Sequence, residues 1–248
     1  MDVALGVLAF WPALALGSFV NVVAARMPLR RSVVRPASAC MSCGSELAWY
    51  DNVPVLSWLL LHGRCRSCSA KISPLYPAVE LATAVLVAAC FFAFGFSGMA
   101  FVSSFFCVVL VAVTATDITH RIVPNRIVLP AAVIVLAAQT ALDPSPEWAL
   151  GALGASGFLL LAALAYPAGM GMGDVKLALL LGAMLGRVVG VGLMLGMLAA
   201  LLPSIVLLAR HGSAARKMGI PFAPFLALGA LIALFAGDAL LDTYLSTF

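Results

Sequence analysis

The chain has 248 residues, of which 64% are apolar and only 10% are charged. An ordinary soluble domain carries roughly a quarter charged residues, so the composition excludes that class. The formal net charge of +4 does not indicate a nucleic-acid-binding protein, because Lys and Arg in a membrane protein first report its orientation.

Apolar segments long enough to cross a bilayer recur along the whole chain. About 20 such residues span roughly 30 Å of hydrocarbon as a helix that satisfies its own backbone polar groups. The pattern predicts an all-α polytopic membrane protein with about eight transmembrane helices. They cover residues 4–25, 77–96, 99–116, 124–142, 148–167, 175–186, 189–209 and 221–241. The sixth is short and is followed by Gly-Arg-Val-Val-Gly, so the sixth and seventh are alternatively one broken or re-entrant element.

The distribution of Lys and Arg predicts which side of the membrane each loop faces. If residues 26–76 are cytoplasmic, every Lys and Arg except Arg187 falls on the inner side, in agreement with the positive-inside bias. The chain begins Met1-Asp2, without the basic stretch of a cleavable signal, so we expect the first helix to be retained. The predicted organisation is a first helix at 1–25, a cytoplasmic cysteine region at 26–76 and a membrane-embedded domain at 77–248.

Four cysteines of the predicted cytoplasmic region form two Cys-x-x-Cys pairs. Cys40 and Cys43 are separated from Cys65 and Cys68 by twenty-one residues. This spacing is typical of a tetrahedral zinc site that stabilises a segment too small for its own core. Two disulfides are the alternative, but the orientation places these thiols in a reducing compartment, where structural disulfides are rare. Four sulfur ligands leave no open coordination position, so we expect the Zn²⁺ ion to be structural.

Two aspartates lie where predicted membrane segments meet short inner loops. Asp117 follows the third segment, and Asp174 lies between the fifth and sixth in the sequence Gly-Met-Gly-Met-Gly-Asp. Two neighbouring carboxylates favour one shared proton, so one can activate water while the other protonates a scissile carbonyl oxygen. Glycines 169, 171 and 173 remove side chains beside Asp174, which would let an extended substrate approach the backbone. Such a pair suits an aspartic peptidase, which would be the domain at 77–248.

Other interpretations of these residues remain open from the sequence. Acids at membrane depth also mark ion-coupled transporters, where Asp117 and Asp174 would form a proton relay, and either could cap a helix. A zinc-bearing scaffold without catalysis is a third hypothesis. For Glu80, we expect a place in the first turn of the second helix, where its charge meets the helix dipole. Cys90 and Cys107 lie singly in apolar helices and are expected to be small buried packing residues.

Taken together, the motifs resemble those of the type IV prepilin leader peptidases, in their bifunctional long form. The similarity covers nearly the whole chain. It departs from the usual pattern at Asn125, where an aspartate is common, and at Leu75, where an arginine often precedes Tyr-Pro. The matching stretches are 17–28, both cysteine pairs, 51–58, 63–68, 72–80, the segment around Asp117, 171–177 and 220–229.

The resemblance implies a GxGD-type aspartic peptidase of the bacterial inner membrane, with its catalytic face toward the cytoplasm. Asp117 and Asp174 occupy the catalytic positions of the family, and Gly171 and Gly173 its active-site loop. The implied substrates are prepilins and pseudopilins, cut after a glycine that ends a short basic leader. The long form also methylates the new amino terminus, usually Phe, with S-adenosylmethionine. No cofactor-binding motif is recognisable, so the methyl-transfer residues are left open.

Overall fold

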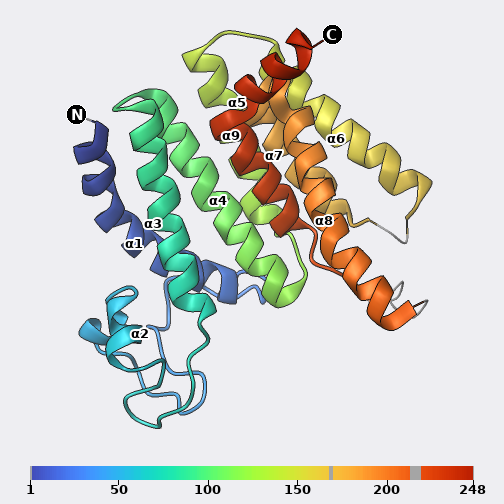
Figure 1. Cartoon of the computed structure of the whole chain (residues 1–248). Helices are drawn as coiled ribbons and strands as arrows, with labels where there is room; N and C mark the ends of the chain where they lie inside the picture. Colours follow the sequence, from blue (N-terminus) through green and yellow to red (C-terminus); the bar gives the residue numbers. More distant parts are fainter. Residues whose placement is uncertain (1, 168–169, 213–218, 248) are drawn as a thin grey trace. The chain divides into compact units, whose positions relative to one another are not determined.

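The computed structural model describes residues 2–167, 170–212 and 219–247 (Figure 1). The predicted all-α fold is confirmed over these ranges, in which the only β-type pairing consists of two isolated bridges in the cysteine region. The long helices are α1 (Asp2–Arg26), α3 (Leu75–Phe94), α4 (Gly98–His120), α5 (Asn125–Leu142), α6 (Glu147–Ala165), α7 (Met172–Leu185), α8 (Val189–His211) and α9 (Ala223–Ser246). Three short elements are η1 (Trp49–Asn52), α2 (Leu56–Leu60) and η2 (Gly186–Val188).

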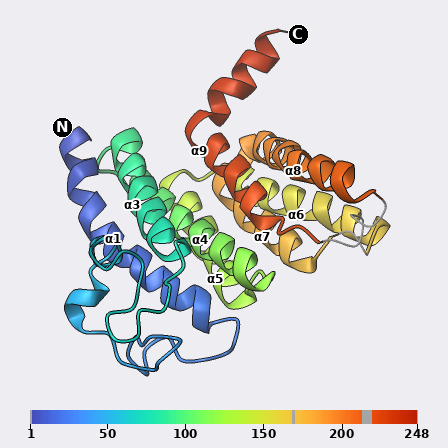
Figure 2. The same ribbon diagram turned by 60° about the horizontal axis from the view of Figure 1, so that its bottom comes forward.

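Seven helical runs within the described ranges are long and apolar enough to cross a membrane. One of them, Met172–His211, has 40 residues and is broken at η2, where Gly186 has a φ of +51°. Beyond the break, α8 runs antiparallel to α9, because Gly192 approaches Gly229 and Gly196 approaches Leu226. The predicted sixth and seventh segments are therefore two separate helices joined by a tight turn (Figures 1 and 2).

The chain divides into two compact units, Met1–Thr116 and Asp117–Phe248. In the first unit, α1 packs along α3. Gly17 makes this possible, since a Cβ at that position would lie 2.6 Å from the Cα of Glu80. Apolar side chains of both helices then form a continuous core, including Ala13, Leu14 and Val87.

One expectation about the first unit is wrong and another is confirmed. Glu80 does not lie in the first turn of α3, because that helix begins at Leu75 and its first turn contains no acid. Its carboxylate instead accepts a 2.7 Å hydrogen bond from the backbone N–H of Val55. Cys90 in α3 and Cys107 in α4 are fully buried, as predicted, and their sulfur atoms lie 3.7 Å apart.

The second unit is built from pairs of helices that cross at glycines. Helix α6 packs on α7 and α8 packs on α9, as Figure 2 shows. A Cβ at Gly182 would collide with the backbone of Gly151, and one at Gly229 would collide with the backbone of Gly192. Where α5 meets α7, the buried Gln139 amide donates to the Met184 carbonyl oxygen at 3.1 Å. Within lipid, helices gain no hydrophobic driving force for association. Small residues at these crossings instead let the backbones approach closely, so van der Waals packing holds the helices together.

Gly182→Ala is expected to destabilise the second unit, because the added methyl group must push α6 away from α7. Overpacking of this kind costs about 1–3 kcal/mol. Gly154→Ala is the matched control: it lies in α6 with nothing within 4 Å of an added Cβ, and should stabilise that helix by up to ~1 kcal/mol. Thermal unfolding of both purified variants in detergent measures the difference. Equal melting temperatures would contradict the proposed crossing.

Candidate active site and metal centre

Asp117 lies inside the last turn of α4, which continues to His120 beyond the predicted end at residue 116. The side chain is only 6% exposed. Its Oδ2 accepts a 3.0 Å hydrogen bond from the backbone N–H of Ala223, the first residue of α9, and the N–H of Phe222 also lies within hydrogen-bonding reach. The carboxylate therefore binds the positive end of the α9 dipole.

Prolines restrict the donors at the start of α9. Pro221 and Pro224 flank Phe222 and Ala223, and proline carries no backbone N–H. The two residues between them keep theirs, and both donors serve Asp117. A buried helix end needs partners for its first N–H groups, and Asp117 supplies one from 106 residues away.

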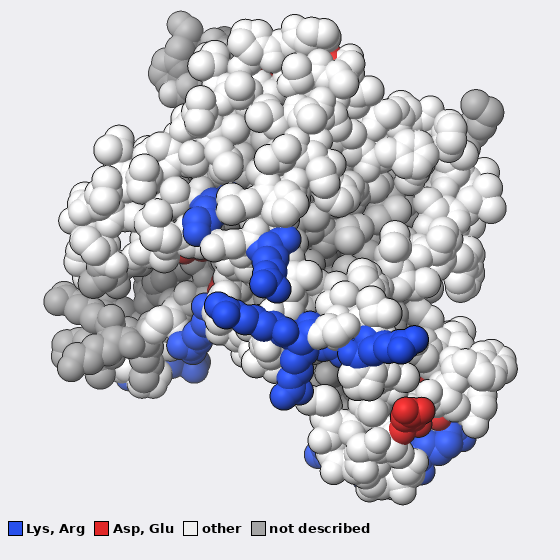
Figure 3. All heavy atoms as spheres, turned by 180° about the vertical axis from the view of Figure 1, so that it is seen from behind, with Lys and Arg blue, Asp and Glu red and all other residues white. Residues whose placement is uncertain are grey.

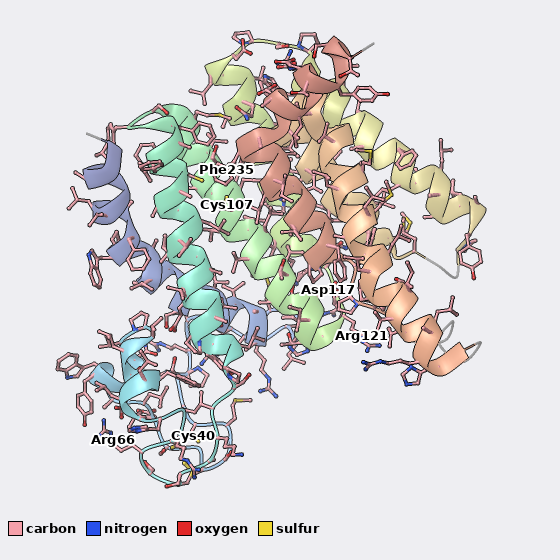
Figure 4. All side chains as sticks on the ribbon, viewed as in Figure 1. Cys40, Arg66, Cys107, Asp117, Arg121 and Phe235 are labelled. Carbon is pink, nitrogen blue, oxygen red and sulfur yellow. The ribbon has the colours of Figure 1, made fainter. Side chains whose placement is uncertain are left out.

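Arg121 adds a positive charge beside the same carboxylate. Its backbone N–H bonds to the Asp117 carbonyl oxygen at 2.9 Å, and its φ of +54° ends α4. The guanidinium attracts the Asp117 carboxylate and lies close to Gly219, on the approach to α9. Figure 4 shows Asp117 and Arg121 at the same end of α4.

Asp174 is the third residue of α7, in its first turn. Its backbone N–H bonds to the carbonyl oxygen of Gly171, the residue before the helix, at 3.1 Å. Its carboxylate is half-buried and lies within electrostatic reach of Asp117, so the two like charges interact. The structure thus brings together the two aspartates that are 57 residues apart in the sequence.

The glycines before Asp174 have distinct surroundings. Gly171 is extended and exposed, with only the Asp174 carboxylate and the neighbouring backbone near an added Cβ. Gly173 lies within α7, where a Cβ would come 2.8 Å from the Cβ of Val123. Gly173 therefore lets the loop after α4 pack against α7, a structural role that the sequence interpretation missed. Gly169 lies outside the described residues.

Lys176 does not pair with Asp174 in the structure. Its Nζ donates to the Oδ1 of Asn125, the first residue of α5, at 3.0 Å. This bond joins the starts of α5 and α7 on the same side as the aspartates. Because Asn125 is a neutral amide, this contact is a hydrogen bond and not an ion pair.

The four predicted cysteine ligands form one cluster. Their sulfur atoms all lie within 4.8 Å of one another, and those of Cys40 and Cys68 are 3.8 Å apart. Four thiolates at about 2.3 Å from a central ion would lie about 3.8 Å from each other. The cluster therefore fits a tetrahedral metal ion.

Both cysteine turns have the same construction. In the first turn, the Gly44 N–H donates to the Cys40 carbonyl oxygen at 2.9 Å. In the second turn, the Ser69 N–H donates to the Cys65 carbonyl oxygen at 2.9 Å. Gly44 and Ser69 each have a positive φ, of 73° and 59°. Such a turn aims two sulfur atoms toward the same point. The sequence predicts this arrangement from spacing alone.

Polar neighbours shift the pKa values of thiols in the cysteine region in opposite directions, with that of Cys68 raised and that of Cys43 lowered. The Ser45 side chain and then its backbone hydrogen-bond to Cys43 and lower the pKa of that thiol to about 6, and the thiolate is the form that binds metal. Arg66 donates to both carboxylate oxygens of Asp51, with a shortest distance of 2.6 Å. This pairing lowers the pKa of Asp51 and raises the pKa of Arg66.

Comparison with known proteins decides the family. A family model for the bacterial peptidase A24 N-terminal domain matches residues 12–94, and the model of the type IV leader peptidase family matches residues 104–237. The chain belongs to the type IV leader peptidase family. No solved structure matches it.

Several curated relatives of this leader peptidase family member carry the name prepilin leader peptidase/N-methyltransferase. The Bacillus subtilis protein is 38% identical over 245 residues, which cover 94% of each chain. The Myxococcus xanthus protein is 40% identical over 207 residues, or 79% of this chain and 61% of the relative. The Pseudomonas aeruginosa protein is 34% identical over 263 residues, covering 94% and 90%. These matches confirm the resemblance inferred from the motifs and give no support to a transporter.

Cys65→Ser is expected to abolish metal retention, because it removes one of four converging sulfur ligands. Elemental analysis of the purified chain should find about one zinc ion per wild-type chain and none in the variant. Cys90→Ala is the matched control, since it removes a thiol outside the cluster. Equal zinc content in wild type and Cys65→Ser would refute the tetrad.

Proposed function

We propose that this protein cleaves the leader peptide of prepilins and pseudopilins and then methylates the new amino terminus. The observation that carries the proposal is the pair formed by Asp117 and Asp174, within electrostatic reach of each other. Membership of the leader peptidase family supports it, because the relatives named above are prepilin leader peptidases and N-methyltransferases.

In the proposed cleavage, Asp117 and Asp174 share one proton. The ionised carboxylate takes a proton from water, whose oxygen attacks the scissile carbonyl carbon, while the protonated carboxyl donates to the carbonyl oxygen. The carbon–nitrogen bond then breaks and the leaving amine receives a proton from the pair. The titration belongs to the pair rather than to either residue.

The residues around Asp117 and Asp174 each have a proposed role in cleavage. The N–H groups at the start of α9 fix the Asp117 carboxylate, so its free oxygen keeps one direction. Gly171 leaves the approach to Asp174 clear of side chains, which suits an extended substrate backbone. Gly173 fixes the Asp174 turn by packing against the loop after α4. These two glycines form the proposed active-site loop.

We further propose that the cysteine cluster holds a structural Zn²⁺ ion, since four sulfur ligands close the coordination shell. The methylation step implies S-adenosylmethionine as the donor of the methyl group. No proposed step in peptide cleavage passes through either group. The metal would instead fix the two cysteine turns, which have little apolar core of their own.

The protein is a multi-pass bacterial membrane protein, and we propose that it lies in the inner membrane. Large apolar side chains such as Leu161 and Leu202 are exposed on α6 and α8, where lipid would cover them. Figure 3 shows one face, most of which is free of charged side chains. The Lys and Arg distribution supports a cytoplasmic cysteine region and a cytoplasmic catalytic face.

Asp117→Asn and Asp174→Asn are each expected to reduce leader cleavage by about 10²-fold or more, because an amide cannot exchange the shared proton. Asn can still accept the hydrogen bond from Ala223, so the start of α9 should be preserved in the first variant. Purified protein, a prepilin and S-adenosylmethionine are mixed, and the product mass reports leader loss and an added methyl group.

Asp242→Asn, an exposed acid near the end of α9, is the matched control and should cleave at the wild-type rate. Wild-type rates in both active-site variants would overturn the catalytic assignment. A wild-type chain that leaves every tested prepilin at full length would overturn the proposed function itself.

A further inference from the structure

Five large apolar side chains are exposed on the cysteine region, outside the long helices. They belong to η1 and α2, and each has at least 50% of its surface exposed. We call these side chains the η1–α2 patch: Trp49, Tyr50, Leu56, Leu59 and Leu60. An exposed apolar patch on an otherwise polar region marks a surface that lipid or another molecule covers.

The three leucines lie on one face of α2. Positions 56, 59 and 60 have the spacing that places side chains next to one another on a helix. Trp58 points the other way, since its indole N–H donates to the Ile72 carbonyl oxygen at 3.2 Å and its ring lies against Gly63. The apolar face of α2 is therefore turned outward, which is the reverse of the arrangement that water favours.

A hydrogen bond fixes the start of α2 beside the first turns of α3. The N–H of Val55, the residue before α2, donates to Oε2 of Glu80 at 2.7 Å, and the Val55 side chain packs on the core between α1 and α3. Glu80 lies five residues into α3, or about 8 Å along its axis. Figure 1 shows α2 at the ends of α1 and α3 that join the cysteine region. Amphipathic helices on a bilayer lie at a similar depth, roughly 5–10 Å into the boundary between headgroups and acyl chains.

Lipid-facing side chains of α1 and α3 lie at the same level as this hydrogen bond. Gly17 of α1 packs against the backbone of Glu80. Leu16 and Phe19 on α1 and Leu81 on α3 are exposed beside these two residues. Both helices are long and apolar enough to cross a membrane, so acyl chains would cover these side chains. The η1–α2 patch therefore continues a surface that already faces lipid.

The aromatic residues of the patch suit the edge of a bilayer. The Trp49 and Tyr50 rings meet edge to face, with centroids 5.6 Å apart. The Arg66 guanidinium lies 5.4 Å from the centroid of the Tyr50 ring while Asp51 holds it through both carboxylate oxygens. Trp and Tyr concentrate where headgroups meet acyl chains, and long basic side chains reach from there toward water.

We propose that the η1–α2 patch inserts into the boundary between lipid headgroups and acyl chains, so that the cysteine region rests on the bilayer. The inference goes beyond the proposed function and needs only the membrane location of α1 and α3. It adds to the spanning helices an element that lies in the membrane surface without crossing it.

The test reads the surroundings of Trp49 by fluorescence. The purified full chain is placed in lipid discs of phosphatidylcholine and phosphatidylglycerol, and the Trp49 emission is the difference between wild type and Trp49→Phe. Lipid brominated near the top of its acyl chains should lower this emission about twofold, whereas iodide in the water should change it little. Trp58, isolated in the same way with Trp58→Phe, is the matched control and should respond less to brominated lipid, because its ring points into the protein.

Leu60→Glu should move the patch toward water, because a carboxylate is costly among acyl chains. Brominated lipid should then quench Trp49 less, and iodide about twofold more. Ala37→Glu adds the same charge at an exposed position of the cysteine region outside the patch, and should leave both responses unchanged. An unchanged Trp58 emission maximum shows that each variant keeps its fold.

Quenching of wild-type Trp49 by iodide but not by brominated lipid would place the patch in water and overturn the inference. Protection from both quenchers would place protein there, such as a second copy of this chain, and would also overturn it. Unchanged quenching in a folded Leu60→Glu variant would contradict it as well. If that variant does not fold, the comparison of wild type with Trp49→Phe decides alone.

Discussion

The hydrogen bond from the Ala223 N–H to the Asp117 carboxylate is the contact on which the catalytic arrangement depends. It joins the end of α4 to the start of α9 and satisfies a backbone donor that has no partner within its own helix. In a membrane protein an unpaired donor costs several kcal/mol, so this bond strongly favours one position for the carboxylate. Asp174 approaches from the first turn of α7, and the glycine crossings of the second unit hold α6 on α7 and α8 on α9.

This arrangement explains how an acid can be both structural and reactive. One oxygen of Asp117 is bound by the helix start, while the charge of Arg121 and the like charge of Asp174 act on the carboxylate as a whole. A side chain held in this way loses little freedom when a substrate binds. The separate acid Glu80 is similarly fixed by a backbone N–H, in the first unit.

Patterns that depend on local chemistry could be predicted from the sequence. Helix positions followed from apolar runs, and the cysteine cluster followed from two short spacings whose turns are built from nearby residues. The pairing of Asp117 with Asp174 could be anticipated because both were predicted at the same membrane depth. The sequence did not decide whether α7 and α8 are two helices or one broken element, because segment length cannot distinguish a tight turn at Gly186 from a kink. Long-range partners could not be predicted: nothing local to Asp117, Glu80 or Cys90 reveals that Ala223, Val55 or Cys107 lies beside it.

The most direct measurement of the central claim is the proximity of the two acidic positions in the membrane. Cysteines are introduced at Asp117 and Asp174, treated with a short bifunctional thiol reagent, and the linked peptides are identified by mass spectrometry. In the control pair, the second cysteine is introduced at Asp238 instead of Asp174. Asp238 lies fifteen residues beyond Ala223 along α9, so the two positions are about 22 Å apart along the helix. The account predicts a link between positions 117 and 174 and none between 117 and 238. No link in the first pair, or equal yields in both, would contradict it.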